Sequence, residues 1–251
     1  MVQRNNLKQI FEHLKYLRLS GIKDCLEDST KTAVKESLSY EDYLLNLLEN
    51  EVQIRRNNRV ARLLRASKLP LEKSLENFDM KRLPLKAVQK VKALLDGGFI
   101  DRTENLLVFG NPGSGKTHLA SAIGQEMIHL GKKILFTNSS LLVQDLLNAK
   151  KELKLAGKLK KLSRFNAIIV DDIGYVQQSR EEMEVLFTLM ADRYERNSII
   201  ITSNLPFSKW EIIFKDPMVT AAAIDRLVHH SIIIELNIES YRIQHAKNSK
   251  H

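Results

Sequence analysis

The chain has 251 residues, a hydrophobic content of 43% and a formal net charge of +9, values that exclude several classes of protein. Its longest apolar runs are only a few residues, far short of the roughly 20 that span a bilayer, and it begins without a long apolar segment. The single Cys25 cannot form an internal disulfide. We therefore expect a soluble cytoplasmic protein without a membrane partner, and the positive charge predicts an acidic partner.

The first part of the chain, up to residue 98, carries helical patterns and no convincing strand. Apolar residues recur at helical spacing from Leu7 to Leu17 and again from Tyr43 to Leu48. Pro70 breaks a basic helix that follows the second pattern, and Pro84 starts another helix. The sequence therefore predicts that the chain begins with a helical region, which ends by about residue 98.

One stretch of this helical region is strongly basic. Between Val52 and Leu71 there are six basic residues and no acidic one. Like charges four residues apart on a helix repel each other, so an ordinary solvated face mixes the two signs. The alternative, a solvated basic face, stays open when this run is considered by itself. The predicted DNA-binding residues in it are Arg55, Arg56, Arg59, Arg62 and Arg65.

Residues 110 to 117 form the most informative motif, a complete G-x-x-x-x-G-K-[ST] phosphate loop. Glycines let the backbone fold closely around a polyphosphate, so that consecutive N–H groups and the start of the next helix face its oxygens. The surrounding pattern places the loop between a strand and a helix, as the motif requires. Lys116 is predicted to reach the β- and γ-phosphates, and the Thr117 hydroxyl to bind Mg²⁺. The predicted ATP-binding residues are Gly110, Asn111, Pro112, Gly113, Ser114, Gly115, Lys116, Thr117 and the adjacent His118.

Strands and helices alternate in the remainder of the chain, which is the pattern of a parallel sheet with right-handed crossovers. This pattern predicts an α/β fold with one five-stranded parallel sheet. The predicted strands are residues 106–109, 133–136, 167–170, 199–202 and 232–236.

The third predicted strand ends in two carboxylates, Asp171 and Asp172. Parallel strands present their carboxyl ends at one edge of a sheet, so we expect these acids beside the phosphate loop. Asp171 is predicted to hold the Mg²⁺ through water, and Asp172 to polarise the attacking water. The next strand leads to Asn204, which either contacts the attacking water or the γ-phosphate, or caps the turn before Pro206. The sequence leaves both alternatives for Asn204 open.

A second basic run lies between the second and third predicted strands. From Lys150 to Arg164 there are seven basic residues and only one acid, Glu152. Two such runs in one nucleotide-binding chain favour contact with nucleic acid over two solvated faces. The predicted DNA-binding residues in this run are Lys158, Lys160 and Lys161.

With these parts in order, the chain resembles the AAA+ ATPases. Within them it is similar to the IstB-like helper proteins of insertion-sequence transposition, which are related to the DnaC and DnaI helicase loaders. The resemblance covers nearly the whole chain. The segments that carry it are Phe99 to Arg102, Asn105 to Leu107, Gly115 to Ala120, Gly174 and Tyr175, Arg193 to Glu195, Thr202 to Asn204, Asp225 to Leu227, and Ser240 to Arg242, with Ser39 to Leu44 and Ser67 to Pro70 near the start.

The resemblance implies further roles for particular residues. Arg226 is the expected arginine finger, inserted into the neighbouring subunit's site, so that activity requires a homo-oligomer. Arg242 is the expected second sensor, contacting phosphate in its own subunit. The alternative for both arginines is a surface salt bridge. The family commonly has Glu at the position of Asp172, so we expect slower hydrolysis, since a misplacement of about 1 Å can cost on the order of a hundredfold.

The resemblance also implies a division of the chain. The expected parts are a helical DNA-binding and assembly domain over residues 1–70, a linker and helix over 71–98, and an AAA+ ATPase domain over 99–251. The few residues after Arg242 leave little or no C-terminal lid.

The favoured function is that of an ATP-dependent, oligomeric regulator of transposition. Such a protein binds double-stranded DNA, selects or remodels the target, and stimulates a separate transposase. The main alternative is a DnaC-like loader of a replicative helicase, which would prefer single strands. A small-molecule kinase is a third possibility, but it needs an acceptor pocket and a lid, and neither basic run fits it.

Overall fold

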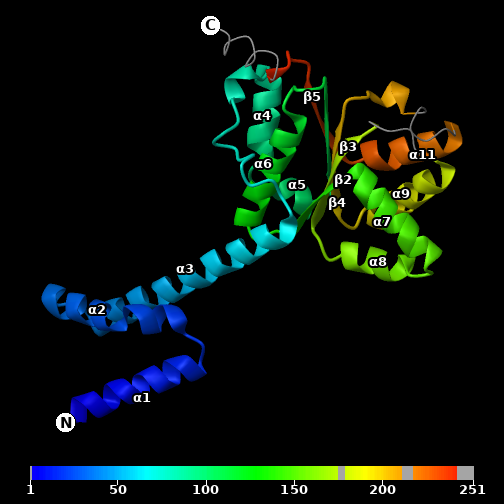
Figure 1. Cartoon of the computed structure of the whole chain (residues 1–251). Helices are drawn as coiled ribbons and strands as arrows, with labels where there is room; N and C mark the ends of the chain where they lie inside the picture. The colour runs from blue at the N-terminus through cyan, green and yellow to red at the C-terminus, as the bar shows by residue number, and fades with distance from the viewer. Residues whose placement is uncertain (1, 175–178, 211–216, 242–251) are drawn as a thin grey trace, which may run out of the picture. The chain divides into compact units, whose positions relative to one another are not determined.

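A computed structural model of the chain describes residues 2–174, 179–210 and 217–241 (Figure 1). Tyr175 and Arg242, both named in the sequence analysis, lie outside the described residues. The chain divides into two compact units, residues 1–62 and 63–251. Each unit has its own packed interior and is described separately.

The N-terminal unit is helical, as predicted. It contains α1 (Val2–Tyr16), α2 (Ser20–Glu36) and most of α3 (Tyr40–Ser67). Helix α3 begins after Ser39, whose hydroxyl accepts a hydrogen bond from the N–H of Asp42 at 3.1 Å. The buried side chains of this unit are Leu14, Ile22, Leu26 and Leu47, and the partly buried Phe11, Leu19, Cys25 and Tyr43 pack against them.

A buried carboxylate joins α2 to α3 inside this unit. Glu51 of α3 accepts hydrogen bonds from the backbone N–H groups of Gly21, at 2.6 Å, and Ile22, at 3.2 Å, in the first turn of α2. Arg55 Nε donates to the same carboxylate at 2.6 Å. Burial raises the pKa of Glu51, but the hydrogen bonds from Arg55, Ile22 and Gly21 outweigh burial and hold the pKa below its ordinary value. The ionised carboxylate therefore satisfies the free N–H groups at the start of α2.

We expect Glu51→Ala to destabilise the packing of α2 on α3 by about 2 kcal/mol, because two buried N–H groups lose their acceptor. Since the folded-state pKa is depressed, this stabilisation is present above the ordinary pKa of a glutamate and is lost as the pH falls through the lower, folded-state value. Amide hydrogen exchange of Gly21 and Ile22 measures the effect. The exposed Glu49 lies on the same helix, and Glu49→Ala should leave this exchange unchanged; equal effects of the two variants would contradict the assignment.

The larger unit has the α/β architecture that the sequence predicts, and all five predicted strands are present. Its strands are β1 (Asn105–Gly110), β2 (Ile134–Asn138), β3 (Ala167–Ile173), β4 (Ser198–Ser203) and β5 (Ser231–Leu236). Its helices are α4 (Leu85–Leu94), α5 (Gly98–Asp101), α6 (Lys116–His129), α7 (Ser139–Lys151), α8 (Leu155–Leu162), α9 (Arg180–Arg193) and α11 (Pro217–Val228), with short 3-10 turns at Met80–Arg82 and Phe207–Lys209. In the part of the chain that the structure describes, no helix is long and apolar enough to cross a membrane.

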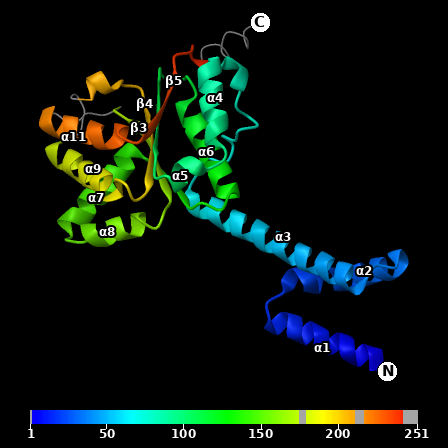
Figure 2. The same cartoon turned by 180° about the vertical axis from the view of Figure 1, so that it is seen from behind.

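The strands form one parallel sheet in the order β2-β3-β4-β1-β5. Helices α4 and α6 cover one face, while α7, α9 and α11 cover the other (Figures 1 and 2). Their apolar faces bury β4 and all but one residue of each of β1 and β3, which explains why these strands are mainly short apolar runs in the sequence. The topology places the end of β4 between the ends of β1 and β3, so three predicted site segments meet at one edge of the sheet.

At the opposite edge of the sheet, one buried arginine joins the strand starts. The Arg193 guanidinium, at the end of α9, donates to the carbonyls of Leu162, at 3.0 Å, Phe165, at 3.0 Å, and Ser198, at 2.9 Å. Burial lowers the pKa of Arg193 to about 10, so the side chain stays protonated at neutral pH. Arg193 therefore ties the loop before β3 to the start of β4.

Candidate active site

The phosphate loop lies between β1 and α6, as its motif requires. Gly113 and Gly115 both have left-handed backbone conformations, with φ of 80° and 95°, which side chains with a Cβ rarely adopt. A Cβ at Gly113 would collide with Ser240, and one at Gly115 would approach the Phe78 ring at 3.1 Å. These two glycines therefore allow both the turn and the close packing around it. The loop leads directly into α6, whose first N–H groups face the loop.

Lys116 begins α6 and is buried. Its Nζ atom donates hydrogen bonds to the carbonyl oxygens of Gly110, at 2.9 Å, and Asn111, at 3.1 Å. A buried ammonium is costly unless it is paired, and these carbonyls partner it within the loop. The side chain is thus held along the loop that is predicted to surround the phosphates.

The two predicted acids lie at the end of β3. Asp171 is buried, and its Oδ1 accepts a hydrogen bond from the Thr202 hydroxyl of β4 at 2.6 Å. Asp172 is half-buried and lines a cavity together with Lys116 and Thr117. The structure therefore brings the second acid and the phosphate loop to one site.

Asn204 lines the same cavity. The turn after β4 is closed by its neighbour, because the N–H of Leu205 donates to the Ser203 hydroxyl at 3.0 Å. The Asn204 Oδ1 atom is buried and has no hydrogen-bond partner among the described residues. The side chain that accepts a backbone hydrogen bond in the turn before Pro206 is thus that of Ser203.

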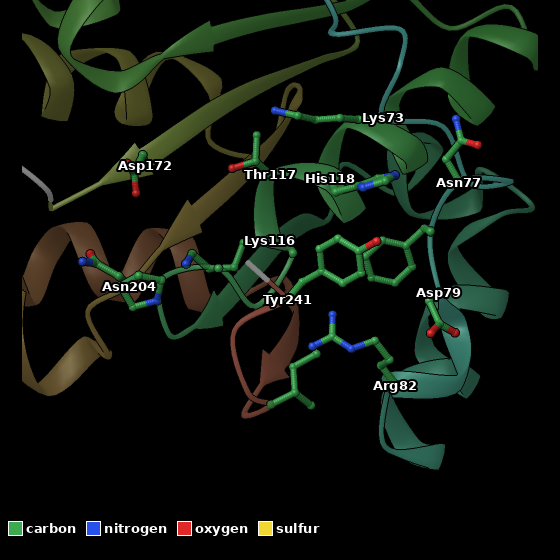
Figure 3. Close-up of a pocket in the computed structure, with 15 residues that line it drawn as sticks. Lys73, Asn77, Asp79, Arg82, Lys116, Thr117, His118, Asp172, Asn204 and Tyr241 are labelled. Carbon is green, nitrogen blue, oxygen red and sulfur yellow. The ribbon is translucent and has the colours of Figure 1, made fainter. Parts of the chain in front are cut away.

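The cavity has a volume of about 530 Å³. Figure 3 shows Asp172 and Asn204 at one end, with Tyr241 and Arg82 at the other. The lining residues are Lys73, Asn77, Phe78, Asp79, Arg82, Pro112, Gly113, Gly115, Lys116, Thr117, His118, Asp172, Asn204, Ile238 and Tyr241. Asp172 thus supplies an acid at one end, and the other end combines aromatic rings and Arg82 with the polar side chains of Asn77 and Asp79.

The second end of the cavity is the part that sequence reasoning missed. The Arg82 guanidinium lies 5.2 Å from the centre of the Tyr241 ring and donates to the Glu239 carbonyl at 2.7 Å. Tyr241 is itself joined to the phosphate loop, because its N–H donates to the Gly113 carbonyl at 3.0 Å. His118 lies in edge contact with the Phe78 ring, with centroids 5.2 Å apart. Of these side chains only His118 was predicted to bind ATP, because Phe78 and Arg82 precede α4 and Tyr241 follows β5, where the sequence pattern indicates no site.

A family comparison agrees with this geometry. The sequence model of the IstB-like ATP binding protein matches residues 12–249. The chain belongs to this family. Similar family members include an insertion sequence ATP-binding protein of Sinorhizobium fredii, 41% identical over 93% of this chain and 79% of its own length. Another is the insertion sequence IS21 ATP-binding protein of Pseudomonas aeruginosa, 35% identical over 94% of this chain and 89% of its own length.

Solved structures share the fold of the larger unit. The DnaC helicase loader matches with a TM-score of 0.55 and 20% identity, over 67% of this chain and 97% of that one. AMPPCP-bound DnaA from Aquifex aeolicus matches with a TM-score of 0.58 and 19% identity, over 74% of this chain and 57% of that one. At these identities the likeness shows the P-loop AAA+ fold alone, which confirms the predicted fold class.

The predicted arginine finger of this family member lies outside the cavity. Arg226, on α11, is half-buried, and its guanidinium carbon lies 4.8 Å from the centre of the Phe187 ring on α9. Its Nη1 atom is buried without a hydrogen-bond partner among the described residues. Arg226 is not one of the residues that line the chain's own nucleotide cavity.

The predicted DNA-binding residues differ in how they are held. Arg55 is exposed, but it pairs with Glu51 and also donates to the Arg18 carbonyl at 2.9 Å, so it is part of the N-terminal fold. Lys158 on α8 forms an ion pair with Asp145 at 2.8 Å. The other predicted residues are exposed on α3 and α8, namely Arg56, Arg59, Arg62, Arg65, Lys160 and Lys161.

Proposed function

We propose that this IstB-like protein hydrolyses ATP as a homo-oligomer, binds double-stranded DNA, and selects or remodels that DNA for a separate transposase. The observation that carries the proposal is the convergence of Lys116, Asp172 and Asn204 on one cavity in a chain of the insertion-sequence ATP-binding family. Nucleotide binding follows from the family and the loop. Hydrolysis, DNA binding and transposase stimulation are the steps that experiments must test.

The cavity suggests how ATP binds. The loop N–H groups and Lys116 would hold the β- and γ-phosphates. The end formed by Phe78, Tyr241 and Arg82 would take the base, because planar rings and a guanidinium stack on aromatic faces. Thr117, which lines the cavity, would bind Mg²⁺ through its hydroxyl, and the buried Asp171 would hold the ion through water, since Mg²⁺ prefers oxygen ligands and keeps several of its waters.

Hydrolysis then depends on the polar end of the cavity. Bound Mg²⁺ would neutralise charge on the phosphates. Asp172 would accept a proton from the attacking water, and Asn204, which lines the same cavity, would contact that water or the γ-phosphate. We propose that turnover is slow, because the Asp172 side chain is one methylene shorter than the glutamate common in the family.

Assembly would complete the site. Arg226 lies outside the chain's own cavity, which supports a role in the site of a neighbouring subunit. A guanidinium supplied in trans stabilises charge that develops on the γ-phosphate during transfer. Arg242 would act in its own subunit, as the family resemblance implies.

DNA binding is expected to use the exposed arginines of α3 and the exposed lysines of α8. Neutralising Arg59 and Arg62, or separately Lys160 and Lys161, to Gln should weaken duplex binding with little dependence on sequence. Each lost phosphate contact should flatten the plot of log affinity against log salt by about 0.9, because fewer counterions are released. Fluorescence anisotropy with labelled duplex and single strands, over a range of salt and with or without ATP, measures both quantities.

The matched control is Lys86→Gln with Lys92→Gln, which removes the same charge from exposed positions on α4. Arg55 and Lys158 are left intact because they pair with Glu51 and Asp145. Wild-type affinity and salt slope in both test variants would overturn the DNA-binding proposal. A clear preference for single strands would instead favour the helicase-loader alternative.

A further inference from the structure

The junction between β3 and β4 contains an irregularity at the two acids. Val170 pairs with Ile201, and the next pair is Ile173 with Ser203, so the register shifts between them. Asp171 and Asp172 therefore both lie opposite a single residue of β4, which is Thr202. Two residues facing one is the definition of a β-bulge, and bulges beside active sites redirect side chains.

The bulge changes the direction of the second acid. Consecutive side chains of a regular strand point to opposite faces of the sheet. Asp172 instead has a left-handed backbone, with φ of 64°, and its side chain enters the cavity. Non-glycine residues adopt this conformation infrequently, although aspartate does so more readily than most. The hydrogen bonds that hold the backbone of Asp172 in it are therefore of interest.

The Thr202 hydroxyl supplies much of this support. Its hydrogen is donated to Asp171 Oδ1 at 2.6 Å, and its oxygen accepts the N–H of Asp172 at 2.8 Å. Thr202 is completely buried, so water does not replace either bond. Asp172 is also held through its carbonyl, which accepts a hydrogen bond from the Ser139 hydroxyl at 3.0 Å. One buried hydroxyl of β4 thus connects the two acids, and Asn204 follows directly after the end of this strand.

We propose that Thr202 is a positioning residue for ATP hydrolysis. Its hydroxyl orients the carboxylate of Asp171 and fixes the backbone of Asp172, so that the metal-binding acid, the base and Asn204 keep one geometry. The inference rests on the proposed ATPase function. Because a displacement of about 1 Å can cost on the order of a hundredfold in rate, a group that touches neither ATP nor water can control turnover through these acids.

The test uses variants of the full chain. Thr202→Val keeps the branched shape but leaves the Asp172 N–H and Asp171 Oδ1 without this partner. Thr202→Ser keeps the hydroxyl. Ser198→Ala is the matched control, because Ser198 is a buried residue on the same strand whose hydroxyl has no hydrogen-bond partner among the described residues.

Three quantities are measured for each variant: exchange of the Asp172 amide by NMR, affinity for a non-hydrolysable ATP analogue with and without Mg²⁺, and kcat with KM. In Thr202→Val we expect faster exchange of this amide, a kcat lowered by about a hundredfold and a KM within about twofold of wild type. The contribution of Mg²⁺ to analogue affinity should also fall, because Asp171 loses its orienting bond. Thr202→Ser should recover most of each value, and Ser198→Ala should match wild type.

The outcomes separate this inference from the function on which it rests. Unchanged amide exchange and unchanged kcat in Thr202→Val would overturn the positioning role. Equal losses in Thr202→Val, Thr202→Ser and Ser198→Ala would also overturn it, because they would indicate general disturbance of β4. Absence of hydrolysis by the wild-type protein under conditions of saturating ATP and DNA would refute the proposed ATPase function. The amide exchange and the Mg²⁺ effect would then still decide whether Thr202 holds the two acids.

Discussion

Lys116→Ala should weaken ATP binding by at least about a hundredfold. The substitution removes the only side-chain cation of the phosphate loop, and with it a charge-assisted contact to the β- and γ-phosphates. The lysine is buried and already held along the loop by the carbonyls of Gly110 and Asn111. Little reorganisation is therefore needed when phosphate arrives. Isothermal titration calorimetry with a non-hydrolysable ATP analogue measures the loss.

The control for this experiment is Lys86→Ala, which removes an exposed lysine on α4. Its ATP affinity should equal that of wild type. The thermal unfolding of Lys116→Ala should be recorded as well, since the substitution removes the two hydrogen bonds within the loop. Unchanged affinity for the ATP analogue in a folded Lys116→Ala protein would show that the cavity is not the nucleotide site.

Arg226→Ala should bind ATP nearly as well as wild type but lose most hydrolysis, by a factor of about a thousand if the arginine acts as a finger in trans. Mixing Arg226→Ala with Lys116→Ala should restore part of the activity. In a mixed assembly, an intact loop from one variant can meet an intact arginine from the other. Steady-state ATPase rates over a range of mixing ratios measure this recovery.

The structure supplies a control for the mixing experiment. Arg226 packs on Phe187, so its removal could disturb the contact between α11 and α9. Arg226→Lys keeps a positive charge at this position while losing the planar guanidinium, and it should retain more activity than Arg226→Ala. No recovery at any ratio, in mixtures shown by native mass spectrometry to co-assemble, would argue against action between subunits.

Several features of this protein were predictable because they depend on local patterns. The phosphate loop needs its glycines at fixed spacing, and the φ values of Gly113 and Gly115 show why. The five strands were evident as short apolar runs because a parallel sheet buries both of its faces. Alternation of strands and helices then indicated that the loop, the two acids and Asn204 would meet at one sheet edge. The resemblance carried by these segments led to the correct family.

Other features depend on contacts between segments far apart in the chain. Nothing local indicates that Arg82 and Tyr241 share one end of the cavity, or that Glu51 caps the start of α2. Sequence alone also left Asn204 undecided, whereas the structure assigns the turn to Ser203.

The motifs and the order of elements were thus determined by the sequence itself, because local propensity and hydrophobic periodicity specify them. Only the tertiary structure decided three other features. These are the end of the cavity that contains Arg82 and Tyr241, the ion pairs of Arg55 with Glu51 and of Lys158 with Asp145, and the bulge opposite Thr202. The physical reason is that a hydrogen bond or a cation–π contact forms only when its two groups lie within a few ångströms of each other. Folding alone brings those groups together, since no periodic pattern in either segment encodes its partner.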